Sequence, residues 1–123
     1  MNWIAPLKQA HDAVIQAQDA GNSPHGLRAA QLLQHGTMKL YFYEPRGEDK
    51  QPPHEQDEVY IIIAGSGTFA IGQSEDSLER IPFNPGDAIF TPAGAIHRFE
   101  DFTDDFQTWV VMWGTTGGEG ATA

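Results

Sequence analysis

Short apolar segments that alternate with glycine- and proline-rich turns constrain the fold of this chain more than any other feature of its sequence. The segments are too short for amphipathic helices and are rich in β-branched and aromatic residues, as strands are. The predicted strands are Ala29–His35, Met38–Tyr43, Val59–Ala64, Thr68–Ile71, Leu78–Ile81, Ala88–Thr91, Ile96–Phe99 and Gln107–Trp113. Strands that follow one another with no helical pattern between them are typical of a closed barrel or of two packed sheets, so we predict an all-β fold.

One helix is predicted ahead of the strands. The apolar residues between Pro6 and Ala20 roughly follow the helical period, Pro6 suits a first turn, and Gly21 can end the helix. We expect this helix to cover one mouth or edge of the barrel. The chain is then a single domain, with a helix and linker over residues 1–25, a barrel over 26–114 and a flexible tail over 115–123.

Composition excludes several classes of partner. The chain has 123 residues, no cysteine and a formal net charge of -10. Its negative field repels phosphate backbones and anionic lipids, so we expect neither nucleic-acid nor membrane binding. No secretory leader is recognised and no apolar run is long enough to span a bilayer. Cysteine-free composition is compatible with a reducing compartment, so a cytoplasmic location is predicted.

Two histidines and one glutamate stand where they can form a metal site. Alternate side chains of a strand share a face, so His54, Gln56 and Glu58 can all point into the barrel. His97 follows the Pro92-Ala93-Gly94 turn and can close the site from another strand. Two imidazoles and one carboxylate suit a divalent transition metal such as Zn, Fe, Mn or Ni, and three protein ligands leave positions open for a substrate.

The second half of this pattern resembles the cupin superfamily. Gly86, Pro92, Gly94 and His97 match the second motif of that family, and Asp101 stands where an asparagine usually falls. The resemblance covers roughly residues 38–113. It implies a cupin-type double-stranded β-helix, also described as a jelly-roll barrel, with the predicted helix outside it.

The first cupin motif is matched only in part. Glu58 and Gly65 fix its register, and His54 takes the place of the second histidine of the family. The first histidine would fall at Pro52, which cannot ligate a metal. We expect the amide oxygen of Gln56, or failing that water, to fill this position, with Gln51 as the next candidate side chain.

Function remains open between two classes of protein at this point. Cupins include metal-dependent enzymes, which here would be dioxygenase- or isomerase-like and act on a small polar molecule held in the barrel. The alternative is a non-catalytic module that binds a sugar or an organic acid, and a metal-free interaction barrel is a third possibility.

Tyr60 and Gln51 are predicted to line the pocket. The strands Val59–Ala64 and Val110–Trp113 are apolar on both faces, so their outer faces need a cover. The predicted helix and a second subunit are both candidates. The resemblance to small cupins, which often pair through their sheets, implies a homodimer.

Overall fold

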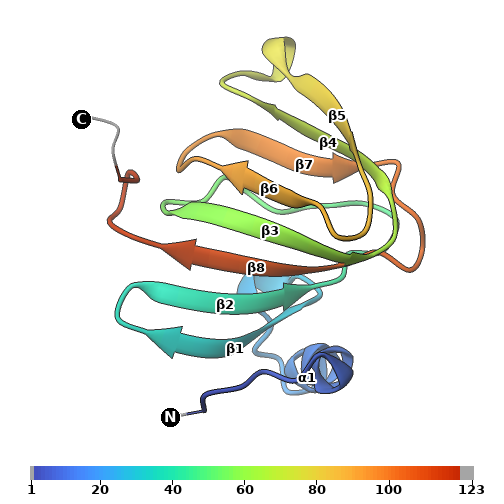
Figure 1. Ribbon diagram of the computed structural model, residues 1–123, viewed down its shortest axis with the longest axis vertical. Coiled ribbons are helices and arrows are strands. Elements are labelled where there is room, and N and C mark those ends of the chain that lie inside the picture. Colours follow the sequence, from blue (N-terminus) through green and yellow to red (C-terminus); the bar gives the residue numbers. More distant parts are fainter. Residues whose placement is uncertain (1, 120–123) are drawn as a thin grey trace.

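The computed structural model describes residues 2–119, which form one helix and eight strands (Figure 1). The elements are α1 (Leu7–Asp19), β1 (Ala29–His35), β2 (Met38–Tyr43), β3 (Asp57–Ala64), β4 (Gly67–Gly72), β5 (Glu79–Phe83), β6 (Ala88–Thr91), β7 (Ile96–Glu100) and β8 (Gln107–Trp113), with short 3-10 turns at Pro24–Gly26 and Glu75–Ser77. Residues 120–123 of the predicted flexible tail lie outside the described residues. No helix within residues 2–119 is long and apolar enough to cross a membrane.

The strands form two antiparallel sheets, which confirms the predicted fold class. One sheet has the order β1-β2-β8-β3-β6 and the other has the order β5-β4-β7. In Figure 1 the strands follow one another from β1 and β2 beside α1, through β8, β3 and β6, to β7, β4 and β5 at the opposite end. Four predicted strands have the observed bounds, and the ends of the other four differ by at most two residues.

An aromatic core fills the space between the sheets. Its buried members come from both sheets and from the segment before β8, and they are Ala29, Tyr43, Tyr60, Ile62, Phe69, Phe83, Phe99, Phe106 and Val110. Most of the rings meet in tilted or edge-to-face pairs, such as Tyr60 with Phe99 at a centroid distance of 4.9 Å. Such pairs add to the stability that burial of the rings provides.

The helix α1 packs on the outer surface of the five-stranded sheet at its β1–β2 edge. Ala10 and Val14 of the helix are almost fully buried and contact Ala30 of β1 and Phe42 of β2. This placement follows from the apolar stripe of the helix, since a helix buries its apolar face against the nearest apolar surface.

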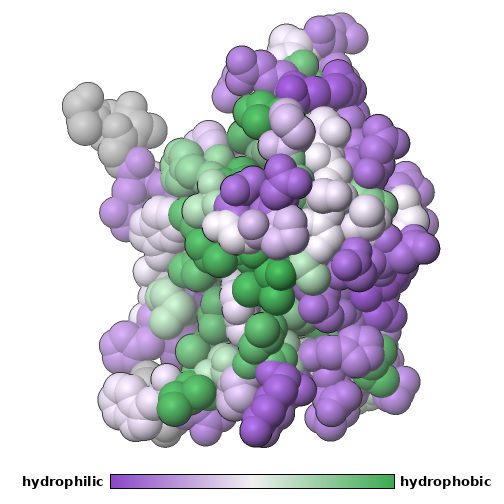
Figure 2. Space-filling model, turned by 45° about the vertical axis from the view of Figure 1, so that its right-hand side comes forward, coloured by the Kyte–Doolittle hydropathy of each residue, from purple (hydrophilic) through white to green (hydrophobic). Residues whose placement is uncertain are grey.

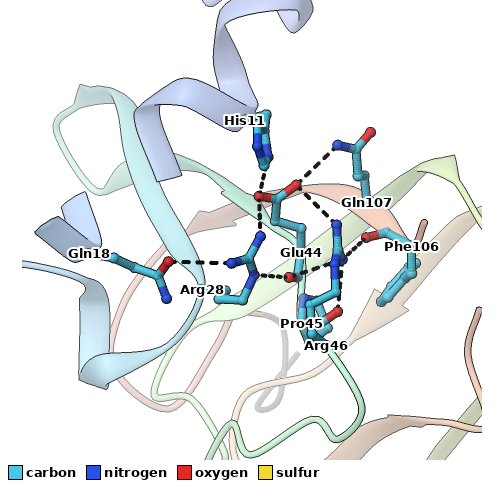
Figure 3. Close-up of polar contacts among 8 residues, drawn as sticks. All are labelled: His11, Gln18, Arg28, Glu44, Pro45, Arg46, Phe106 and Gln107. Atoms are coloured by element: carbon cyan, nitrogen blue, oxygen red, sulfur yellow. Dashed lines mark hydrogen bonds and ion pairs between the residues drawn. The ribbon is translucent and has the colours of Figure 1, made fainter. Parts of the chain in front are cut away.

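A buried carboxylate joins the helix to the barrel (Figure 3). Glu44, directly after β2, is fully buried and accepts from Arg28 at 2.9 Å and from Gln107 at 3.0 Å. Its Oε1 also lies 2.6 Å from Nδ1 of His11 in α1, and Arg46 lies 3.6 Å from Oε2. Each carboxylate oxygen therefore has at least two nitrogen neighbours, so the charge of Glu44 is compensated by groups from four segments of the chain.

We expect Glu44→Gln to lower the free energy of unfolding by about 1–3 kcal/mol, because an amide cannot pair with both arginines. Urea denaturation measures this change. Glu48→Gln, at a nearby exposed position, serves as the matched control and should change stability little. Equal losses in the two variants would show that the Glu44 cluster does not stabilise the fold.

Candidate metal centre

The structure brings His54, Glu58 and His97 together in one group. Glu58 lies on β3 in the five-stranded sheet, His97 lies on β7 in the three-stranded sheet, and His54 lies in the bend before β3. One ligand atom from each of the three residues falls within 4.8 Å of the others. Oε1 of Glu58 is 2.8 Å from Nε2 of His97, and Oε2 is 3.9 Å from Nε2 of His54. The predicted convergence of these residues is therefore present.

Backbone contacts fix the segments that carry the two histidines. The N–H of Gly94 donates to the carbonyl of His54 at 2.8 Å, which ties the turn before β7 to the bend before β3. Gly94 has a φ of 81°, a backbone conformation that residues with a side chain rarely adopt, so the turn requires glycine at this position. The Asp57 carboxylate accepts from the N–H of Ala93 in the same turn and of Glu119 near the end of the described chain, both at 2.9 Å.

The polar atoms of the group are those expected of metal ligands. Nδ1 of His97 lies 2.9 Å from the carbonyl oxygen of Ala95, which can only accept, so Nδ1 carries the proton and Nε2 presents its lone pair to the site. Nε2 of His97 and Oε2 of Glu58 are buried without a hydrogen-bond partner among the described residues. A divalent transition metal fits this set of donors, since it would compensate both atoms at once.

Burial and charge shift the pKa values in the group. Burial lowers the pKa of His54 from its ordinary value, with the Glu58 carboxylate acting in the opposite direction. Burial also acts to lower the pKa of His97, but the Glu58 carboxylate and the Ala95 carbonyl outweigh it, so that pKa is raised. Burial, together with the charge of Glu58, raises the pKa of Tyr60 well above its ordinary value. The Tyr60 hydroxyl therefore stays protonated and donates to Oε1 of Glu58 at 3.1 Å.

The structure places Gln56 differently from the sequence-based expectation. Its amide nitrogen donates to the carbonyl oxygens of Thr37 and Gly114, both at 3.0 Å, and its side chain is not among the three grouped residues. The expectation assumed a strand running through His54 to Glu58. Because β3 begins only at Asp57, strand alternation does not extend back to Gln56.

Gln51 lies closer to the group. Its Oε1 is 3.2 Å from Nε2 of His54 and 3.0 Å from the Tyr60 hydroxyl, whose single proton is shared between Gln51 and Glu58. Its orientation depends on Asp49, a buried residue that sequence reasoning did not single out and that no local motif marks. His25 lines the same cavity as His54 and Gln51.

A cavity of about 160 Å³ opens beside His54. Its walls include apolar side chains from β2, β8 and the segment before β1, such as Leu27, Val110 and Met112, and its polar margin includes Lys39 and Gln51. Tyr60, predicted to line the pocket, is not among the residues that line this cavity, and its hydroxyl contacts Glu58. A mostly apolar hollow with a few polar groups beside a candidate metal centre is typical of a small-molecule site.

Comparison with known proteins identifies the family. A profile of the family described as ARD/ARD' matches residues 40–115, which include His54, Glu58 and His97. The chain belongs to the ARD/ARD' family. The Streptomyces coelicolor protein SCO3923, called uncharacterized, is 30% identical to this chain over 100 residues. The aligned residues are 80% of this chain and 88% of that protein.

Acireductone dioxygenases are among the relatives of this ARD/ARD' chain. The acireductone dioxygenase of Tuber melanosporum is 44% identical over 62 residues, which are 50% of this chain and 32% of that enzyme. The chain thus matches less than a third of the length of that relative.

Solved structures show the same barrel. A Cupin 2 conserved barrel domain protein from Salinispora arenicola superposes with a TM-score of 0.61 and is 22% identical in sequence. The superposed residues are 94% of this chain and 91% of the Salinispora chain. At this identity the likeness concerns the fold alone. The fold of this ARD/ARD' chain is therefore the cupin barrel that the sequence motifs indicated.

We expect the double variant His54→Ala/His97→Ala to lose stoichiometric divalent metal, because it removes two of the three ligand atoms. Elemental analysis of protein purified without an affinity tag measures the metal content. His35→Ala, at an exposed position of β1, is the control and should keep the content of the unaltered protein. A full equivalent of metal in the double variant would place the ion elsewhere.

Proposed function

We propose that the protein is a metal-dependent dioxygenase whose substrate is an acireductone, an enediol conjugated to a carbonyl group. The observation that carries this proposal is the convergence of His54, Glu58 and His97 with two buried ligand atoms left without partners. Two histidines and one carboxylate with open positions are the ligand set of many non-haem iron oxygenases. Membership of the ARD/ARD' family and similarity to acireductone dioxygenases support the substrate class.

The proposed reaction balances without an added reductant. Oxidative cleavage of the enediol C=C bond in R–CO–C(OH)=CHOH by O2 gives R–CO–COOH and HCOOH, so both oxygen atoms enter the products. The four electrons that reduce O2 come from the substrate itself. A bound divalent metal would supply Lewis-acid stabilisation of negative charge on the enediol oxygens.

The surrounding residues provide orientation and a dry, shaped site. The Ala95 carbonyl fixes the tautomer of His97, and the Tyr60 hydroxyl holds one oxygen of Glu58. The apolar cavity walls would accept the R group, and Lys39 at the margin would attract the acidic enediol in its anionic form. This local positive charge matters because the chain as a whole carries a formal charge of -10.

The alternative is a module that binds a sugar or an organic acid without turnover. The same cavity and the same polar margin favour it, because neither depends on O2 chemistry. The two functions differ in one measurable respect, which is consumption of O2 in the presence of bound metal and an acireductone.

We expect protein loaded with Fe(II) or Ni(II) to take up one O2 per molecule of a short-chain alkyl acireductone. Glu58→Gln should abolish this uptake, because the amide removes the only anionic ligand among the three. An oxygen electrode and formate detection measure the reaction, with His35→Ala as the control that keeps full activity. Metal-loaded protein that binds the acireductone without taking up O2 would instead support the binding module.

We also propose that two copies pair through the outer surface of the five-stranded sheet, in the cytoplasm. Leu40, Val111, Val59 and Phe90 are successive cross-strand neighbours on β2, β8, β3 and β6, and Phe90 is 55% exposed. Figure 2 shows hydrophobic residues gathered in a band on one side of the molecule, flanked by hydrophilic ones. Contiguous exposed apolar surface is typical of association sites.

Replacing Phe90 by lysine should shift a dimer toward the monomer, because the charge would be buried within the paired surface. Sedimentation velocity measures the molecular mass. Leu7→Lys, at a similarly exposed position on α1, is the control and should leave the mass unchanged. A monomeric unaltered protein, or a Phe90→Lys variant that stays dimeric, would contradict this mode of pairing.

A further inference from the structure

Position 52 cannot supply a ligand, but the residue before it can. The Pro52 side chain has no donor atom, and Pro52 is exposed. Gln51 is half-buried and faces the candidate metal centre. Two donor atoms bound at ~2.1 Å to one ion, at right angles or slightly wider, lie about 3.0–3.4 Å apart. The 3.2 Å between Oε1 of Gln51 and Nε2 of His54 falls within this range.

The Asp49 carboxylate determines which end of the Gln51 amide faces the site. Nε2 of Gln51 donates to Oδ2 of Asp49 at 2.7 Å, and the backbone N–H of Gln51 donates to Oδ1 at 3.2 Å. Rotating the amide by a half-turn would set its oxygen against a carboxylate that can only accept. The oxygen of Gln51 is therefore held toward His54.

Asp49 is itself held by both sheets. It is buried, and Oδ2 accepts from the backbone N–H of Phe99 on β7 at 2.8 Å. Oδ1 accepts from the hydroxyl of Tyr43 on β2 at 2.5 Å. These contacts fix the Gln51 amide before any ion binds, and fixed ligand orientation is what increases the affinity of metal sites.

We propose that Gln51 supplies a fourth, neutral oxygen donor to the metal through Oε1, with Asp49 as its positioning residue. The proposal rests on the metal centre of the proposed function. A carbonyl oxygen has two lone pairs, so Oε1 can keep its bond from Tyr60 while it binds an ion. The complete set of two imidazoles, one carboxylate and one amide oxygen carries a single negative charge and suits Mn(II), Fe(II), Ni(II) or Zn(II).

The two glutamines of the segment provide a matched test. Gln51→Leu should weaken Zn(II) binding about tenfold or more, because it removes the donor and leaves an apolar group. Gln56→Leu should leave the affinity unchanged, since that amide is bound to backbone carbonyls outside the group. Competition with a chromophoric chelator measures the two affinities, and circular dichroism checks that each variant is folded. Unchanged affinity in Gln51→Leu would overturn the proposal.

Asp49 is tested through a double-variant cycle. Asp49→Asn should weaken Zn(II) binding when Gln51 is present, because an amide partner no longer forbids rotation of the glutamine. The same change should have no effect in the Gln51→Leu background, where no donor remains to be oriented. Equal losses in both backgrounds would show that Asp49 acts on the fold and does not position Gln51.

A measurement on the unaltered protein covers the case in which the variants do not fold. One equivalent of Zn(II) should shift the side-chain amide resonances of Gln51 in a 1H–15N spectrum and leave those of Gln56 in place. Zn(II) that binds through His54 and His97 without moving the Gln51 resonances would refute the fourth donor and leave the proposed function standing. Protein that binds no divalent metal at all would refute the proposed function itself.

Discussion

The contact between Glu58 and His97 is the constraint on which the rest of the site depends. Glu58 belongs to one sheet and His97 to the other, and both side chains are almost fully buried where the sheets face each other. A carboxylate in such a place costs several kcal/mol unless nearby groups compensate its charge. The protein nevertheless leaves one oxygen of Glu58 and one nitrogen of His97 without partners. A divalent cation bound between the two residues would compensate both atoms.

A second buried carboxylate in the same chain shows what complete compensation looks like. Both oxygens of Glu44 have nitrogen neighbours, which come from α1, the segment before β1, the loop after β2 and β8. Glu58 receives one hydrogen bond, from Tyr60. The contrast lies within one fold and at equal burial, so it does not arise from a general shortage of donors. The Glu44 carboxylate joins structural elements, whereas the Glu58 carboxylate has an oxygen available for a ligand.

The sequence predicted the strands and the three grouped residues because both depend on local patterns. Turns such as Pro92-Ala93-Gly94 are determined by the conformational limits of proline and glycine, and alternation on β3 sets the direction of Glu58. Local patterns do not determine which of Gln51 and Gln56 lies nearer the candidate metal centre. Residues 51–56 form no strand, so their side chains are directed by distant partners such as Asp49. The Glu44 cluster was missed for the same reason, because its members lie up to 63 positions from Glu44.

The segment before β3 also explains why a proline can stand where related barrels have a histidine. In an extended strand, adjacent side chains point to opposite faces, so a donor could not move by one position without leaving the site. In the bend of this chain that rule does not apply, and Gln51 reaches His54 while Pro52 faces outward. The fixed φ of proline limits the freedom of the bend, and Asp49 holds the amide within it. The outward position of Pro52 and the inward orientation of Gln51 thus both follow from the same local departure from strand geometry.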